Sequence, residues 1–168
     1  MLAVAQWMFS RGAKTVKIHP DGMHAKYFDI RGWLETEGFE KVRPLGPTRE
    51  AGHYVKQEQS LSIEFKPGQG DVVGDVRGRR VVVKAKGGCI NTRHPGQLSK
   101  PRRHIYEAIG MLLDRHEEVD RRIAAVPRHG ETEKISRRMA RRCHDAGIEI
   151  ALVSDDGGVE LCEAKSSD

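Results

Sequence analysis

Two apolar runs joined by a tight turn constrain the fold of this chain most. Residues 71–86 read DVVGDVRGRRVVVKAK, so an arginine–glycine pair separates two valine-rich segments. A two-residue connection of this kind is typical of a β-hairpin. Residues i and i+2 of a strand share a face, which places Lys84 and Lys86 side by side at the end of the second segment. The hairpin also predicts that Asp71 lies near these two lysines.

Further elements are expected on both sides of this hairpin. Residues 1–22 predict an N-terminal arm or short helix, and residues 23–168 a single domain. Helical periodicity and turn residues predict the remaining elements: a helix from about Met23 to Glu37, one strand or a strand pair over 53–65, a helix from about 97 or 99 to 115, a strand over 122–127, a helix over 132–146, and strands over 148–153 and 159–162. This order predicts a mixed α/β fold.

The excess of positive charge weakly favours a nucleic-acid partner. The chain has 168 residues, a net charge of +5 and a pI of about 9.2. Its cations gather in two clusters, which are interpreted either as nucleic-acid contacts or as solvated helix faces: Lys100, Arg102, Arg103 and His104 in one, Arg137, Arg138, Arg141 and Arg142 in the other. Aromatic residues make up only 5%, which argues against base stacking and favours duplex recognition through the phosphate backbone.

Several other classes of protein are not indicated. No apolar run approaches 18 residues, so no membrane span is expected. The three cysteines, Cys89, Cys143 and Cys162, form no CxxC pair, and no HExxH motif occurs, so neither a disulfide framework nor a zinc site is predicted. A reducing, cytoplasmic location fits this cysteine usage best.

The run GDVVGDVRGRRVVVKAKGG resembles the core of the PD-(D/E)xK nuclease superfamily, the restriction-endonuclease-like enzymes. That family places an aspartate at the start of one strand. On the next strand it places an acid, any residue and a lysine. Asp71 and Lys86 match these positions, but Lys84 stands where the family has its second carboxylate. The α-β-β-β-α-β order also matches, and the resemblance implies a mixed central β-sheet flanked by helices.

The resemblance implies a metal-dependent DNA endonuclease that hydrolyses phosphodiester bonds, with Mg²⁺ or Mn²⁺ held by Asp71. It implies Asp71, Lys86 and Gln97 as catalytic residues, with Lys84 in the altered position, and it matches Tyr106 in the following helix. The residues expected to contact duplex DNA are Arg93, Lys100, Arg102 and Arg103. A homodimer is also expected, because cutting both strands often needs two active sites.

Lys84 is the departure that matters for activity. An ammonium in place of a carboxylate ligand should weaken metal binding by orders of magnitude, because each charge pair at about 4 Å is worth about 4 kcal/mol at an effective dielectric of 20. Another acid could take the missing place. Glu35 or Glu37 matches an acid that some members carry on their first helix. Other candidates are Asp75, Glu64 and, least favoured because it lies three turns into a helix, Glu107.

Three alternatives to an active nuclease remain. The chain could be a disabled nuclease, or a pseudo-nuclease that binds nucleic acid without cutting. It could also be an interaction module in a defence or repair assembly. Salt-dependent binding without cleavage would identify the pseudo-nuclease.

Overall fold

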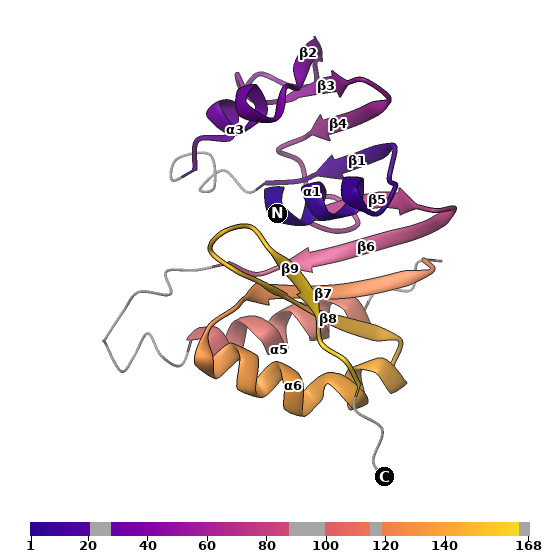
Figure 1. Ribbon diagram of the computed structural model, residues 1–168, viewed down its shortest axis with the longest axis vertical. Helices are drawn as coiled ribbons and strands as arrows, with labels where there is room; N and C mark the ends of the chain where they lie inside the picture. The colour runs from indigo at the N-terminus through magenta and orange to yellow at the C-terminus, as the bar shows by residue number, and fades with distance from the viewer. Residues whose placement is uncertain (21–27, 88–99, 115–118, 165–168) are drawn as a thin grey trace. The chain divides into compact units, whose positions relative to one another are not determined.

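The computed structural model describes residues 1–20, 28–87, 100–114 and 119–164 (Figure 1). They form two compact units, Met1–Arg80 and Val81–Asp168, which are described in turn. Each unit combines helices with a sheet that contains both parallel and antiparallel pairs, so the predicted mixed α/β class is confirmed. The finer prediction, a restriction-endonuclease-like core, stays a prediction, as does a domain boundary at residue 22.

In its described residues, the first unit is a five-stranded sheet with two helices. Its elements are α1 (Leu2–Ser10), β1 (Thr15–Ile18), α3 (Ile30–Glu37), β2 (Glu40–Pro44), β3 (Gly52–Lys56), β4 (Gln59–Ile63) and β5 (Val72–Val76). The strand order is β2-β3-β4-β1-β5. β1 runs parallel to β4 and antiparallel to β5, so a strand from the start of the chain separates β4 from β5. We did not expect this strand.

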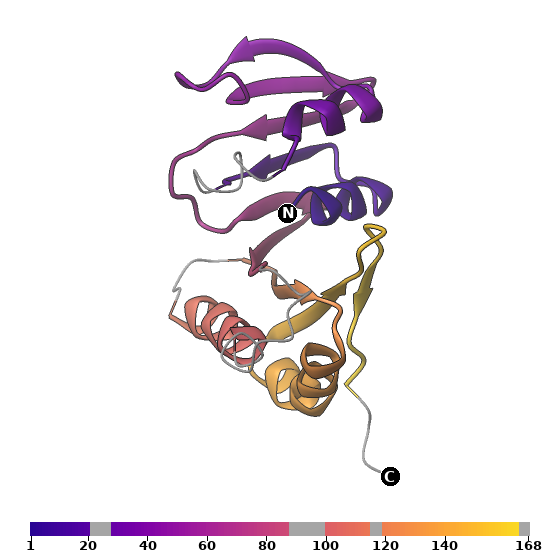
Figure 2. The ribbon, with the colours of Figure 1, turned by 90° about the vertical axis from the view of Figure 1, so that its left-hand side faces the viewer.

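Both helices of the first unit lie along the same side of its sheet (Figure 2). The rings of Phe9 at the end of α1 and Phe39 just after α3 are 5.6 Å apart, and Trp33 stacks on Phe39. Gly74 of β5 lets α1 approach closely, since a Cβ there would lie 3.1 Å from the Met8 sulfur. A short helix was one of the two alternatives for residues 1–22, and α1 occupies Leu2–Ser10 of that range.

Local signals account for the bounds of α3 and of the strand pair that follows. The Asp29 side chain accepts a hydrogen bond from the Gly32 amide and caps α3, which therefore begins at Ile30 rather than near residue 23. Residues 21–27 lie outside the described part of the chain. Gly38 adopts the left-handed conformation that ends the helix. β3 and β4 confirm the strand pair over 53–65. β2 was missed because all its residues are exposed and show no apolar periodicity.

The second unit alternates strands and helices. Its elements are the Val81–Ala85 part of β6 (Arg79–Ala85), α5 (Lys100–Leu113), β7 (Arg121–Pro127), α6 (Gly130–Asp145), β8 (Ile148–Val153) and β9 (Val159–Leu161). β6, β7 and β8 are parallel neighbours, and β9 adds antiparallel to β8. The predicted helices and strands after residue 100 are all confirmed, with bounds that are unchanged or shifted by at most three residues.

The helices α5 and α6 lie side by side and cover the sheet of the second unit (Figure 1). The core between these layers is aliphatic, with Ile105, Leu112, Ile123, Ile150 and Leu152 almost fully buried. A parallel sheet buries both faces of its strands, which explains the near-continuous apolar runs of β7 and β8.

The predicted turn between β5 and β6 is present. Arg77 and Gly78 both have positive φ, 55° and 76°, as a type I′ hairpin turn requires. The Asp75 carboxylate accepts a hydrogen bond from the Gly78 amide at 2.8 Å and stabilises this turn.

Candidate functional site

The carboxyl ends of the three parallel strands meet at one edge of the second unit's sheet. Lys86 follows β6, Arg128 follows β7 and Ser154 follows β8. In open α/β sheets, ligands bind at this edge. The edge therefore collects polar side chains where a substrate could reach them.

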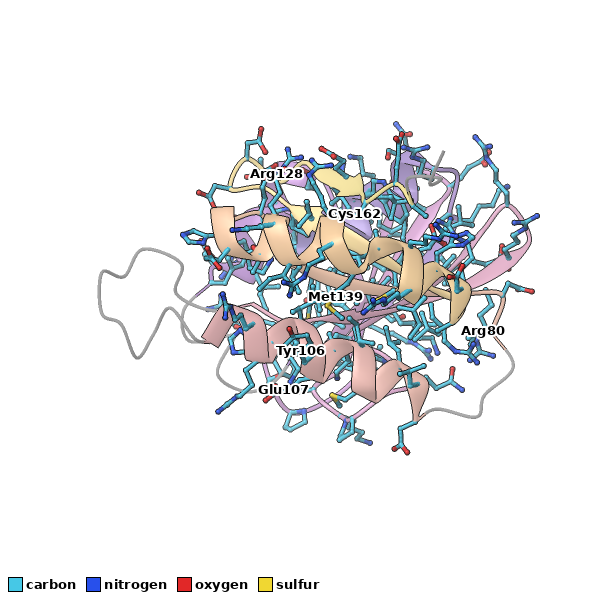
Figure 3. All side chains as sticks on the ribbon, turned by 90° about the horizontal axis from the view of Figure 1, so that it is seen from below. Arg80, Tyr106, Glu107, Arg128, Met139 and Cys162 are labelled. Carbon is cyan, nitrogen blue, oxygen red and sulfur yellow. The ribbon has the colours of Figure 1, made fainter. Side chains whose placement is uncertain are left out.

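Lys86 is held by backbone and side-chain contacts within the second unit. Its amide donates to the Ala125 carbonyl at 3.0 Å, which continues the β6–β7 ladder. Its ammonium lies 3.4 Å from Oε2 of Glu107, and the Arg103 guanidinium lies 2.9 Å from the other Glu107 oxygen. Both members of the Lys86–Glu107 pair are about one-third exposed. Figure 3 shows Glu107 and its neighbour Tyr106 on α5.

Glu107 is ionised at neutral pH. Partial burial opposes ionisation, but the hydrogen bond from Lys86 and the charges of Lys86, Arg103 and His104 outweigh it and lower the pKa of Glu107. A carboxylate already in its charged form is a suitable ligand for a hard cation. The two cations beside it compensate its charge, so it is a weaker ligand than a free carboxylate would be.

The sequence ranked Glu107 last among the candidate acids, yet it is the one that the second unit places beside Lys86. A position about two turns into α5 gave no hint of this contact. The only local signal was Arg103 four residues earlier, which fits an i,i+4 ion pair on a helix. The contact with Lys86 depends on how α5 packs on the sheet.

Lys84 is half-buried and lies opposite Ala124 in the β6–β7 ladder. Asp71 precedes β5 in the first unit, where its carbonyl accepts the His19 amide at 2.8 Å. Because Asp71 and the two lysines belong to different units, their predicted approach stays a prediction. Gln97 and Arg93 lie outside the described residues, as does the side chain of Lys100.

Two of the other candidate acids border a hollow of about 510 Å³ in the first unit. Glu64 and Asp75 line it, together with Thr15, Lys17, His19, Gly68, Gln69, Val73, Gly74 and Arg80. The Arg80 guanidinium donates to the Gln69 side-chain carbonyl, and His19 Nδ1 lies 3.0 Å from the Lys66 carbonyl. Asp75 is engaged in the turn already described. The hollow is thus lined by apolar surface as well as by cations and carboxylates.

The acids of α3 belong to surface ion pairs of the first unit. Glu35 pairs with Arg31 at 2.6 Å, and Glu37 lies 3.8 Å from the Lys56 ammonium. Among the described residues, neither ion pair includes a residue that lines the hollow, and neither includes Asp71. Their predicted role as metal ligands therefore has no support within the first unit.

The expected DNA-binding arginines of α5 are exposed, and each has an acidic partner. Arg102 lies 3.2 Å from Glu131 of α6, and Arg103 pairs with Glu107.

A further network of ion pairs, at the β9 edge, was not predicted from the sequence. Arg128 and Arg137 both bind Glu160, and both also contact Glu133. Arg128 and Cys162 lie on this side of α6 in Figure 3.

Among the described residues, no group of three or more His, Cys, Asp or Glu side chains is assembled that could hold a metal ion. Mg²⁺ is often bound by only one or two carboxylates, with water and substrate phosphates completing its shell. Glu107 is the carboxylate that the second unit places next to the proposed catalytic lysine, Lys86.

In the part of the chain that the structure describes, no helix is long and apolar enough to cross a bilayer.

Comparisons with protein-family models, with curated proteins and with solved structures find no match to this chain.

Proposed function

We propose that this chain is a nuclease domain that hydrolyses phosphodiester bonds of duplex DNA with Mg²⁺ or Mn²⁺. The observation that carries the proposal is the contact between Lys86 and Glu107 at the carboxyl end of β6. It joins the cation that the resemblance assigns to catalysis with a carboxylate that could replace the acid lost at position 84. The resemblance adds Asp71 as a further metal ligand.

The roles follow from charge. Lys86 would stabilise the negative charge that develops on a phosphate oxygen as the bond to the leaving group breaks. Glu107 would orient Lys86 and contribute an ionised oxygen to the metal shell. A bound Mg²⁺ would polarise the phosphate and lower the pKa of the attacking water. Lys84 would oppose metal binding, because its charge has the wrong sign for a ligand position.

The test is cleavage of supercoiled plasmid in Mg²⁺ or Mn²⁺, together with Mn²⁺ binding by calorimetry. We expect Lys86→Met to lower the cleavage rate by about 10²–10³-fold, the typical effect of losing one charge-stabilising group. We expect Lys84→Glu to bind Mn²⁺ at least tenfold more tightly and to cut faster. Glu107→Gln should weaken both metal binding and cleavage.

Glu58→Gln is the matched control, since Glu58 is an exposed acid paired only with Lys14 among the described residues. It should cut at the rate of the unaltered chain. The proposal fails if neither the unaltered chain nor Lys84→Glu binds Mn²⁺ or cuts any DNA or RNA tested.

A second candidate function is duplex binding without cleavage. Lys84 in the ligand position favours it, and so does the neutralisation of Glu107 by two cations. It predicts binding in EDTA whose log affinity falls linearly with log salt concentration, with no cleavage by any of the variants. Binding that does not change with salt would rule it out.

A further inference from the structure

The outward side of α6 carries a line of cations. Lys134, Arg138 and Arg142 follow one another at four-residue intervals, and all three are exposed. Residues with this spacing share one side of a helix. The opposite side of α6 is buried against the sheet and α5 through Ile135, Ser136, Ala140 and Cys143, among others. We call the three cations the α6 stripe.

The α6 stripe differs from Arg137 of the same helix in having no ion-pair partner among the described residues. Arg137 donates to Glu133 at 2.7 Å and to Glu160 at 3.2 Å. Among the described residues, by contrast, no ion pair joins a member of the α6 stripe to a carboxylate. Arg137 is thus paired with carboxylates, whereas its neighbour Arg138 is in no ion pair with a carboxylate among the described residues.

Such a line of like charges works against the helix. Cations one turn apart repel each other and destabilise the helix that carries them. The helix dipole favours a cation in the last turn and so accounts for Arg142, but it does not account for Lys134 or Arg138. An anionic ligand would remove the repulsion along the whole stripe.

We propose that the α6 stripe binds the phosphate backbone of duplex nucleic acid. The stripe extends about 12 Å at a rise of 1.5 Å per residue. Over that length B-DNA presents about seven phosphate charges, at one per 1.7 Å of axis. This surface is separate from the Lys86–Glu107 site, and its binding needs no cleavage.

Other anionic partners fit this surface less well. A helix that binds a lipid surface inserts an apolar face, but the apolar face of α6 is buried in the core. Protein interfaces centre on aromatic and aliphatic anchors, whereas the exposed positions of α6 after Gly130 hold only charged side chains and a histidine. The lack of aromatic residues there also argues against single strands, which stack their bases on such rings.

The test measures binding of a fluorescent 25-base-pair duplex in EDTA over a range of KCl concentrations. We expect the triple variant Lys134→Gln/Arg138→Gln/Arg142→Gln to bind at least tenfold more weakly at low salt. Its slope of log affinity against log salt should fall by about 2.7, since each lost phosphate contact contributes about 0.9. Circular dichroism verifies that the variant keeps its helices.

The variants Arg138→Gln and Arg137→Gln form a matched pair, because each loses one exposed arginine of α6. Comparing them shows whether binding depends on the α6 stripe itself or only on the net positive charge of the helix. We expect Arg138→Gln to weaken binding and Arg137→Gln to leave it within twofold. Equal effects of these two variants would overturn the proposal, and so would unchanged binding by the triple variant. Stripe-dependent binding to phosphatidylserine vesicles or polyglutamate that is tighter than binding to the duplex would also overturn it.

The same assay keeps this proposal distinct from the nuclease proposal. If Lys86→Met binds the duplex through the stripe but no variant cuts DNA, the stripe proposal stands and the nuclease proposal fails. If the plasmid is cut and the triple variant binds as tightly as the unaltered chain, the reverse holds.

Discussion

The two units use their carboxylates differently. In the second unit, Glu107, Glu149 and Glu160 are each held by an arginine or lysine of a neighbouring element. In the first unit, Glu64 and Asp75 border the hollow instead, although Glu37 also pairs with Lys56 of β3, and the contact between α1 and the sheet depends on the small size of Gly74. The first unit therefore relies on close packing at this contact, and the second on ion pairs between its elements.

Of the substitutions that test this comparison, enlarging Gly74 should have the largest effect on stability. A Cβ at this position would meet the Met8 sulfur and the Thr15 carbonyl, each at 3.1 Å, and the carbonyl belongs to the backbone. We expect Gly74→Val to destabilise the first unit by about 2 kcal/mol, within the range for overpacked cores. Urea unfolding followed by tryptophan fluorescence measures this, since Trp7 and Trp33 both lie in the first unit.

Gly110 of α5 is the matched control in the second unit. It is exposed, and a Cβ there would meet nothing within 4 Å. Gly110→Ala should raise stability by about 0.5–1 kcal/mol, because alanine favours a helix over glycine by that amount. A stabilised Gly74→Val would show that α1 does not depend on this close approach.

Ion pairs should matter more in the second unit than in the first. Arg121 donates to both oxygens of Glu149, at 2.7 and 2.8 Å, and both side chains are less than one-third exposed. We expect a double-mutant cycle with Arg121→Ala and Glu149→Ala to give a coupling of about 1 kcal/mol, the upper end for such pairs.

The corresponding cycle in the first unit uses Lys14 and Glu58, which are 78% and 84% exposed. Its coupling should be close to zero, since exposed pairs in water contribute little. If the two cycles give equal couplings, the proposed difference between the units is wrong.

As the pH falls, the second unit should lose stability at a higher pH than the first. This loss should be smaller than the effects of the substitutions above. The hydrogen bond from Arg128 is the main cause that lowers the pKa of Glu160 below its ordinary value of 4.5, and the Ser154 hydroxyl does the same for Asp156, whose ordinary value is 3.8. A carboxyl whose pKa is lower in the folded state stabilises the fold above its unfolded pKa. That stability is lost as the pH falls through the folded value.

Hydrogen exchange between pH 6 and 2.5 measures this effect. After correction for the intrinsic exchange rate, protection of β9 and the start of α6 should decrease below about pH 4.5, while protection of β3 and β4 should change less. Arg128→Gln is the control, because it removes the main cause for Glu160 and should flatten the pH dependence. An earlier loss of protection in β3 and β4 would contradict the comparison.

The sequence alone determined the elements that depend on neighbouring residues. Valine runs and a turn that needs positive φ predicted β5, β6 and the Arg77–Gly78 connection. Apolar periodicity predicted α5, a glycine stop at Gly147 marked the end of α6, and apolar runs predicted the strands. These features could be predicted because spacing, capping and turn geometry act over a few residues.

Only the tertiary structure decided which distant residues meet. β1 lies between β4 and β5 because its backbone pairs with strands more than forty residues away. Glu107 reaches Lys86 because α5 packs back onto the sheet, and Arg137 differs from Arg138 because β9 brings Glu160 to one side of α6. Such contacts depend on packing between elements, and the order of residues along a single helix or strand does not contain that information.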